Sequence, residues 1–172
     1  MSRVRPKGDA LTEATSQAVD VTWECLEFAD LSTAKLYAIL ALRSEVFVVE
    51  QECAFADVDG LDPGCVHLLG WEGDSLAVYA RIVPEEAWRP GAVSIGRIVS
   101  RPRLRGRGLG IEVLARALDY LRERGNALPI ELVSQHRLER FYERFGFESV
   151  GEPYEHDGQP HVTMVLDPSH DA

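Results

Sequence analysis

The most constraining feature of the chain is a strand pattern, a glycine-rich turn and a helix pattern that follow one another over residues 92–124. Apolar residues alternate with more polar ones over roughly residues 92–100, which predicts a half-buried strand. From about 108 to 124 the apolar residues recur at helical spacing instead. The turn at 101–108 therefore joins a buried strand directly to the first turn of a helix.

This turn has the composition of an anion site. Glycines at 106, 108 and 110 allow a sharp backbone turn and leave its N–H groups exposed. These groups lie at the positive end of the helix dipole, and Arg105 and Arg107 add charge-assisted contacts. Such an arrangement suits a pyrophosphate. A purely structural turn or a solvated run of charge stays open from this segment alone.

Two common phosphate-binding loops do not match. The chain has no Gly-Lys-Ser/Thr sequence, which a Walker A loop requires. The dinucleotide fingerprint G-x-G-x-x-G would need a glycine where Ile111 stands. The remaining pattern is R-x-x-G-x-G, formed by Arg105, Gly108 and Gly110.

Composition limits the class of protein. The chain has 172 residues and a net charge of -10, which favours one acidic globular domain and argues against a nucleic-acid partner. Its three cysteines form no CxxC pair, so neither a disulfide framework nor a zinc site is expected. No apolar stretch approaches the length of a membrane span, and no secretory signal is visible. We expect a cytoplasmic protein with a mobile tail at residues 1–20 and a single domain at 21–172.

The rest of the chain alternates strands and helices. The predicted order is strands, helix, strand, helix, strand around a mixed sheet, an α/β (α+β) arrangement. Ser32 is the expected N-cap of the first helix, and residues 51–64 read as a loop. The predicted strands cover residues 23–28, 66–71, 76–83, 92–100, 130–134 and 161–166, and a short helix precedes Gly146.

With these elements placed, the sequence resembles the GCN5-related N-acetyltransferase (GNAT) superfamily over roughly residues 21–166. One signature is Ile98-Val99-Ser100, Pro102 and the R-x-x-G-x-G turn with its helix. The second is Gln135 followed by the segment 141–147, FYERFGF. Within the superfamily, the segments at 42–51, 57–60, 67–71, 95–97, 154–155 and 160–161 are most similar to the ElaA-like group.

The resemblance implies a mostly antiparallel mixed sheet, flanked by helices and with splayed central strands, that binds acetyl-CoA as cosubstrate without a metal. Backbone groups of the strand would pair with the pantetheine arm, and the turn would hold the pyrophosphate. Relatives often carry Asn where this chain has Gln135, and a longer amide can shift that contact. The implied cofactor-binding residues are Ile98, Val99, Ser100, Arg105, Gly106, Arg107, Gly108, Leu109, Gly110, Gln135 and Tyr142.

The implied reaction is direct attack of a primary amine on the thioester carbonyl. Tyr142 matches the acid that protonates the leaving thiolate, although a tyrosine beside Phe141 on an amphipathic helix is otherwise ordinary packing. Glu50, at the end of an apolar helix, is the first candidate for the base. Asp57, Asp59, His67 and His161 are further candidates, and we interpret the two histidines as structural.

Residues 57–62 resemble a calcium loop, but Leu68 stands where an EF-hand needs Glu, so we expect an acidic loop near the acceptor.

Two other functions compete with the enzyme. One is a GNAT fold that binds acetyl-CoA as a sensor without turnover. The other is an enzyme like acyl-homoserine lactone synthases, suggested by Arg43, Phe47 and Glu50. The expected partner is a small-molecule or peptide amine, with a homodimer possible and no nucleic acid or membrane. Phe47, Phe55, Trp71 and Tyr79 are candidate acceptor-site aromatics.

Overall fold

The computed structural model of the chain describes residues 20–156 and 158–168. The predicted N-terminal tail, residues 1–20, therefore lies outside the described residues except for Asp20.

The described residues form a seven-stranded sheet in the order β1-β2-β3-β4-β5-β7-β6. Neighbouring strands are antiparallel except for the central pair β4 and β5, which are parallel. The mixed, mostly antiparallel sheet expected from the sequence is confirmed. The strands are β1 Thr22–Glu27, β2 Val66–Glu72, β3 Ser75–Val83, β4 Val93–Ser100, β5 Ile130–Gln135, β6 Glu148–His156 and β7 Gln159–Leu166.

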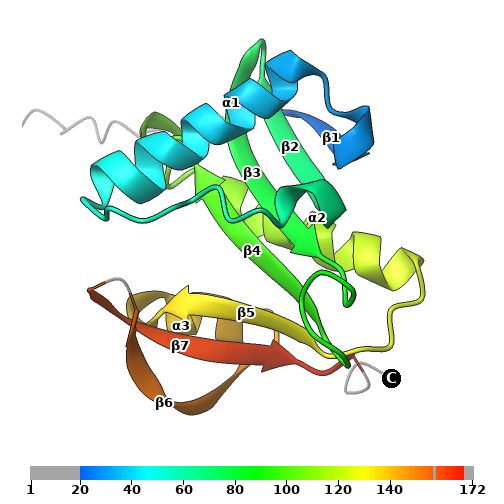
Figure 1. Ribbon diagram of the computed structural model, residues 1–172, viewed down its shortest axis with the longest axis vertical. Coiled ribbons are helices and arrows are strands. Elements are labelled where there is room, and N and C mark those ends of the chain that lie inside the picture. Colours follow the sequence, from blue (N-terminus) through cyan, green and yellow to red (C-terminus); the bar gives the residue numbers. More distant parts are fainter. Residues whose placement is uncertain (1–19, 157, 169–172) are drawn as a thin grey trace, which may run out of the picture.

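The central pair is splayed. β4 and β5 are paired only at Val93–Ile130 and Ser94–Glu131, near the start of each strand. Beyond these pairs the strands diverge, so the sheet opens into an upper part, β1 to β4, and a lower part, β5 to β7 (Figure 1). The expected splay is confirmed, and it creates the space in which the site lies.

Helices cover both faces of the sheet. α1 (Thr33–Arg43) crosses one face of β2 to β4, and α2 (Leu109–Glu123) lies on the other face, with α3 (Glu139–Glu143) behind β5 and β7 (Figure 1). Each helix buries one apolar side against the sheet, which explains why two core clusters form. Leu42 and Tyr79 belong to the cluster under α1, and Val113 and Met164 belong to the cluster on the α2 side. No helix in the described ranges has both the length and the apolar character to span a bilayer.

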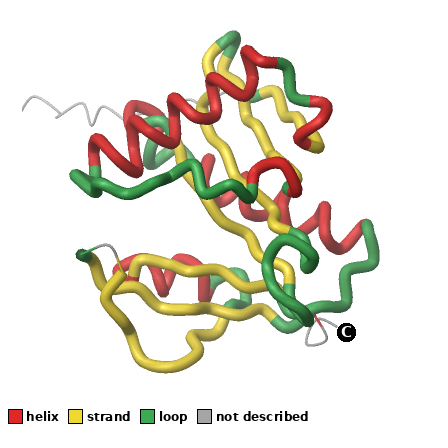
Figure 2. The backbone as a smooth tube through the Cα atoms, in the orientation of Figure 1, coloured by secondary structure: helices red, strands yellow, loops and turns green. Residues whose placement is uncertain are grey.

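The α1 segment begins as predicted and ends differently. The Ser32 side chain accepts a hydrogen bond from the Lys35 N–H at 3.2 Å, so the predicted N-cap is confirmed. After Arg43 the helix continues as a wider π-helix, η2 (Ser44–Glu50), and a loop then passes in front of the sheet toward β2 (Figure 2). Short π-helical segments of this kind are frequent at functional sites.

One strand, β6, is not predicted from the sequence. β6 is exposed at every residue, so it lacks the apolar alternation by which a strand is recognised. Pairing with β7 forms it, and this pairing shifts register between Val150 and Tyr154.

Candidate active site

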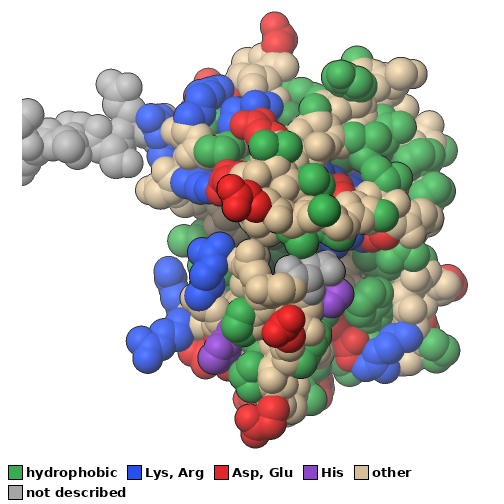
Figure 3. Space-filling view, turned by 60° about the vertical axis from the view of Figure 1, so that its left-hand side comes forward, with side chains coloured by type: hydrophobic (Ala, Val, Ile, Leu, Met, Phe, Trp, Pro, Cys, Tyr) green, Lys and Arg blue, Asp and Glu red, His purple; other side chains and the backbone are tan. Residues whose placement is uncertain are grey.

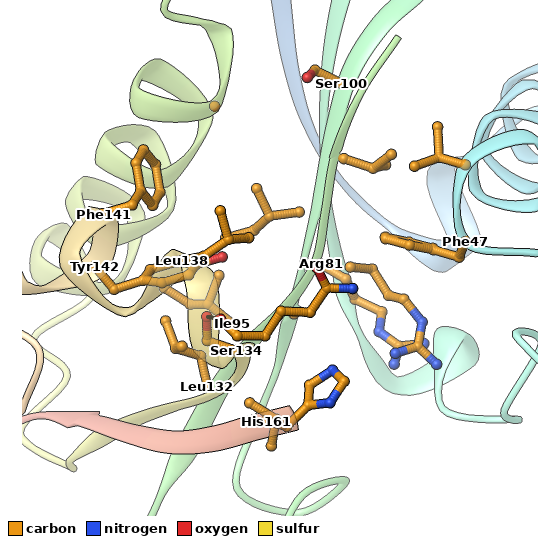
Figure 4. Close-up of a pocket in the computed structure, with 18 of the residues that line it drawn as sticks. Phe47, Arg81, Ile95, Ser100, Leu132, Ser134, Leu138, Phe141, Tyr142 and His161 are labelled. Carbon is orange, nitrogen blue, oxygen red and sulfur yellow. Dashed lines mark hydrogen bonds between the residues drawn. The ribbon is translucent and has the colours of Figure 1, made fainter. Parts of the chain in front are cut away.

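A cavity of about 880 Å³ lies where β4 and β5 diverge. It is lined by β4, the turn after it, the start of α2, α3, η2 with its following loop, and the β6–β7 hairpin. The space-filling view shows the molecule hollowed between its upper and lower parts, with histidines on the lower part (Figure 3). In the close-up, Phe141 and Tyr142 lie across the cavity from Phe47, and the His161 ring points inward (Figure 4).

One side of the cavity, called here the donor wall, consists of residues 96–111: the end of β4, the turn and the first residues of α2. Arg97 has φ +53°, uncommon for a residue with a side chain, and with Ile98 it forms a bulge opposite Ala80. The segment of β4 that pairs with β5 ends at Ser94, so the β4 backbone from 95 onward faces the cavity. This edge can therefore pair with an extended ligand arm.

The turn has the geometry that the sequence predicts. Gly106 and Gly108 adopt φ +76° and +83°, and a Cβ at either position would meet no atom within 4 Å. Gly108 is the N-cap of α2 and provides no side-chain cap, so the first N–H groups of a 15-residue helix stay open to a ligand. Open backbone donors beneath free space fit a pyrophosphate.

Arg105 and Arg107, the two arginines expected to contact the pyrophosphate, have different surroundings. Both guanidinium Nη atoms of Arg105 donate to the Glu50 carboxylate, at 2.6 and 2.8 Å. The hydrogen bond from Arg105 is the main reason that the pKa of Glu50 lies below its ordinary value. Glu50 thus forms an ion pair with the arginine that is predicted to bind phosphate, and this pair links η2 to the donor wall. Arg107 is exposed.

Tyr142 is buried, with 8% of its surface exposed, and lines the cavity. Its ring packs edge-on against Phe141 at 4.9 Å and Phe147 at 6.1 Å between centroids. Burial raises the pKa of its hydroxyl to about 12. The hydroxyl therefore keeps its proton at neutral pH and is a hydrogen-bond donor.

The Gln135 side chain connects β5 to the loop that follows η2. Its Nε2 donates to Gln51 Oε1 at 3.2 Å, and its Oε1 accepts from Arg137 Nε at 3.0 Å. The residue predicted to contact the cosubstrate thus bridges β5 to the loop after η2. Gln51 was not predicted as a site residue.

The opposite side of the cavity, called here the acceptor wall, includes Phe47, Phe55, Asp59 and Arg81. A partly buried arginine–aspartate network lies behind it and joins it to Arg97 of the donor wall. Asp57, Asp59 and Asp62, from the predicted acidic loop, bind arginines from α1, β3 and β4. The contacts are Arg43 Nε–Asp57 at 2.8 Å, Arg43 Nη1–Asp62 at 2.8 Å, Arg81 Nη1–Asp62 at 2.6 Å, Arg81 Nη2–Asp59 at 2.5 Å, Arg97 Nε–Asp57 at 2.9 Å and Arg97 Nη2–Asp59 at 3.1 Å.

The network contains three arginines and three aspartates, so its formal charges cancel. Arg43 is fully buried and Arg81 is 3% exposed, which ties the acidic loop to the sheet. Arg81 was not predicted as a site residue. The sequence feature that could have indicated it is a charged residue inside the otherwise apolar strand at 76–83.

The other predicted residues divide between the cavity and the core. His67 is fully buried: its Nε2–H donates to the Asp62 carbonyl at 3.1 Å, and its Nδ1 accepts from the Tyr79 hydroxyl at 2.7 Å. With both nitrogens bonded, His67 is structural, as its sequence context indicates. Among the four predicted aromatic residues, Phe47 and Phe55 line the cavity, whereas Trp71 and Tyr79 pack in the α1-side core.

Comparison with known proteins identifies the family. Residues 44–168 match the model of the acetyltransferase (GNAT) domain. ElaA of Escherichia coli (strain K12) is 40% identical over 148 residues, which span 84% of this chain and 95% of that protein. Its crystal structure has a TM-score of 0.81 at 39% identity, covering 86% of this chain and all of the other.

A solved acyl-CoA N-acyltransferase from Pseudomonas aeruginosa is similar to the same extent. Its TM-score is 0.82 at 40% identity, with 86% of this chain and 99% of the other covered. Both solved structures share the fold of this chain over 86% of its length. The chain therefore belongs to the GNAT acetyltransferase family, whose members are acyltransferases, and within it is similar to ElaA.

Proposed function

We propose that this enzyme transfers an acetyl group from acetyl-CoA to a primary amine by direct attack, with Tyr142 as general acid. The observation that carries the proposal is the position of Tyr142: a buried, protonated hydroxyl in the same cavity as the open edge of β4. The pantetheine arm would lie along Ile98, Val99 and Ser100. The pyrophosphate would lie on the turn from Arg105 to Gly110, and the thioester would then face Tyr142.

Burial acts on both partners of the proton transfer. It raises the pKa of Tyr142, and a thiolate formed in the same apolar surroundings also gains proton affinity. The phenol can therefore donate to the leaving sulfur although it is a weak acid in water. The ring contacts with Phe141 and Phe147 hold the hydroxyl in place.

Glu50 is the base expected from the sequence, and it lines the cavity. Both of its oxygens accept from Arg105, and the lowered pKa makes it a weaker proton acceptor. Its role as base requires Arg105 to turn from Glu50 to a bound pyrophosphate.

The proposal is tested by release of free CoA thiol when acetyl-CoA is mixed with alkylamines, amino acids and lysine-containing peptides. Turnover of at least one amine supports it. Tight acetyl-CoA binding without thiol release on any amine would favour the sensor, and S-adenosylmethionine binding would favour the lactone-synthase type of enzyme.

Tyr142→Phe tests the acid role at saturating acetyl-CoA. The variant keeps the ring but loses the donor, so kcat should fall by roughly 10²-fold or more, the usual contribution of a general acid. Tyr120→Phe, on α2 and outside the cavity lining, is the matched control. Unchanged turnover in Tyr142→Phe would exclude the acid role.

A further inference from the structure

His161 and His67 use their ring nitrogens differently. His67 is fully buried and engages both nitrogens. His161, near the start of β7, is half-buried, and its Nδ1 lies 2.9 Å from the Gln159 carbonyl oxygen. A carbonyl oxygen can only accept, so Nδ1 must carry the proton. In the neutral ring the lone pair then lies on Nε2.

This nitrogen belongs to a ring that enters the cavity. His161 lines the cavity together with Tyr142 and the edge of β4, and its ring points inward (Figure 4). No hydrogen bond joins His161 Nε2 to any residue within 20–156 or 158–168. The fixed tautomer thus presents an unprotonated nitrogen to the space that the two substrates would share.

The sheet places the His161 ring next to Gln135, whose side chain is bound to Gln51. His161 is the cross-strand partner of Gln135 on β5, and Gln135 binds Gln51 on the acceptor side. Side chains of a cross-strand pair lie on the same face with Cβ atoms about 5 Å apart. The His156 ring packs edge-on against His161 at 5.3 Å between centroids, which restrains it from β6.

We propose that His161, oriented by the Gln159 carbonyl, is the general base that removes the proton from the acceptor amine. This inference rests on the proposed acetyl transfer and names a residue for a step that the sequence analysis assigned to Glu50. Both oxygens of Glu50 accept from Arg105, whereas the Nε2 lone pair of His161 is in contact with no arginine of the described residues.

The proposed step balances in protons. The acceptor ammonium gives one proton to His161 Nε2, and its nitrogen lone pair forms a bond to the thioester carbonyl carbon. The C–S bond then breaks, and Tyr142 donates its proton to the leaving sulfur. The new amide nitrogen loses its second proton, which restores the Tyr142 hydroxyl, and His161 releases its proton to solvent. One proton leaves per acetyl group transferred.

Several groups that line the same cavity as His161 carry charge or titrate, and the test must separate them from it. They come from η2, the loop after it, β3, β4, the turn, the segment after β5, α3 and β6. The residues are Glu50, Cys53, Asp59, Arg81, Arg97, Arg105, Arg137, Tyr142, Tyr154 and His156.

His161→Asn is the discriminating variant, because the Asn side-chain amide can keep the donor to the Gln159 carbonyl while Nε2 is lost. The measurement is the pH profile of kcat/KM for an alkylamine that the wild type acetylates. The wild-type profile should have an acidic limb, because a protonated His161 ring has no lone pair with which to accept the proton of the amine. In the variant, kcat/KM should drop by roughly 10²-fold or more at neutral pH.

The loss should also depend on pH in a defined way. As the pH rises toward the pKa of the acceptor, the amine becomes neutral without help, so the gap between variant and wild type should narrow. Thermal stability and acetyl-CoA affinity should not change. His136→Asn, at an exposed histidine outside the cavity lining, is the control and should keep the wild-type profile.

The outcomes separate the inference from the proposed function. A wild type that releases no thiol with any amine overturns both. An active wild type with an equally active His161→Asn variant overturns the inference and leaves the function standing. The same holds for a variant that loses activity equally at every pH and keeps the acidic limb, because only a structural role would give that result. The inference is supported if His161→Asn loses the acidic limb of the kcat/KM profile and if its difference from the wild type narrows at high pH.

Discussion

The donor wall presents mainly backbone groups to the cavity, whereas the acceptor wall presents side chains held by other side chains. On the donor wall, the bulge at Arg97, the turn with Gly106 and Gly108 and the uncapped start of α2 expose N–H and C=O groups. On the acceptor wall, Arg43 and Arg81 hold the aspartates of the acidic loop. Under the proposed function, the backbone groups of the donor wall would contact the parts that all CoA thioesters share. The side chains of the acceptor wall would then determine which amine binds.

The largest expected effect comes from breaking the arginine–aspartate network behind the acceptor wall. Arg43→Met removes a fully buried cation and leaves Asp57 and Asp62 partly unpaired in the interior. Loss of one partner from a buried ion pair typically costs about 3–5 kcal/mol. We therefore expect the free energy of unfolding, measured by urea titration, to fall by about that amount.

The matched control for this prediction is Arg122→Met, because Arg122 forms an exposed ion pair with Asp119 on α2. An exposed pair contributes about 0–1 kcal/mol, so the control should remain close to the wild type. Equal losses in the two variants would mean that the buried network contributes no more than a surface pair.

The same contrast decides what could be predicted from the sequence. β4 and α2 were predicted to within about a residue at each end, because alternation, glycines and helical spacing are local patterns. The arginine–aspartate contacts join residues 14 to 40 positions apart, for example Arg43 with Asp57 and Arg97 with Asp57, and no local pattern specifies such pairs.

Strand β6 and the proposed role of His161 are two further points that the sequence does not predict. β6 depends on pairing with β7 and has no buried side to reveal it. His161 was interpreted as structural because a strand pattern does not show which ring nitrogen is bonded. That assignment needs the position of the ring relative to the Gln159 carbonyl on the same strand, which the sequence pattern does not give.

The donor wall can be tested separately at its turn. Gly108→Ala places a side chain at φ +83° and projects it into the open space proposed for the pyrophosphate. A non-glycine residue in this conformation costs about 1–2 kcal/mol. We expect that loss of stability, and a rise of at least about tenfold in the Kd for acetyl-CoA, measured by calorimetry.

Gly125→Ala separates strain from ligand contact. Gly125 follows the other end of α2 with φ +70°, and a Cβ there also meets no atom within 4 Å. Its stability loss should match that of Gly108→Ala, while acetyl-CoA affinity stays unchanged. If both variants lost affinity equally, the effect of Gly108→Ala would come from strain in α2 and not from contact with the ligand.

The smallest expected effect lies where the two walls meet, at the ion pair between Glu50 and Arg105. A pyrophosphate would have to compete with the Glu50 carboxylate for this guanidinium. Glu50→Gln removes the competing charge, and the pair is exposed, so its contribution is about 0–1 kcal/mol. Acetyl-CoA should therefore bind more tightly by up to about fivefold, and the gain should shrink at high salt. Glu45→Gln, which breaks an exposed pair with Arg101 instead, is the control. Weaker acetyl-CoA binding by Glu50→Gln would mean that Glu50 orients Arg105 for the ligand. A large loss of kcat with unchanged affinity would mean that Glu50, and not His161, is the base.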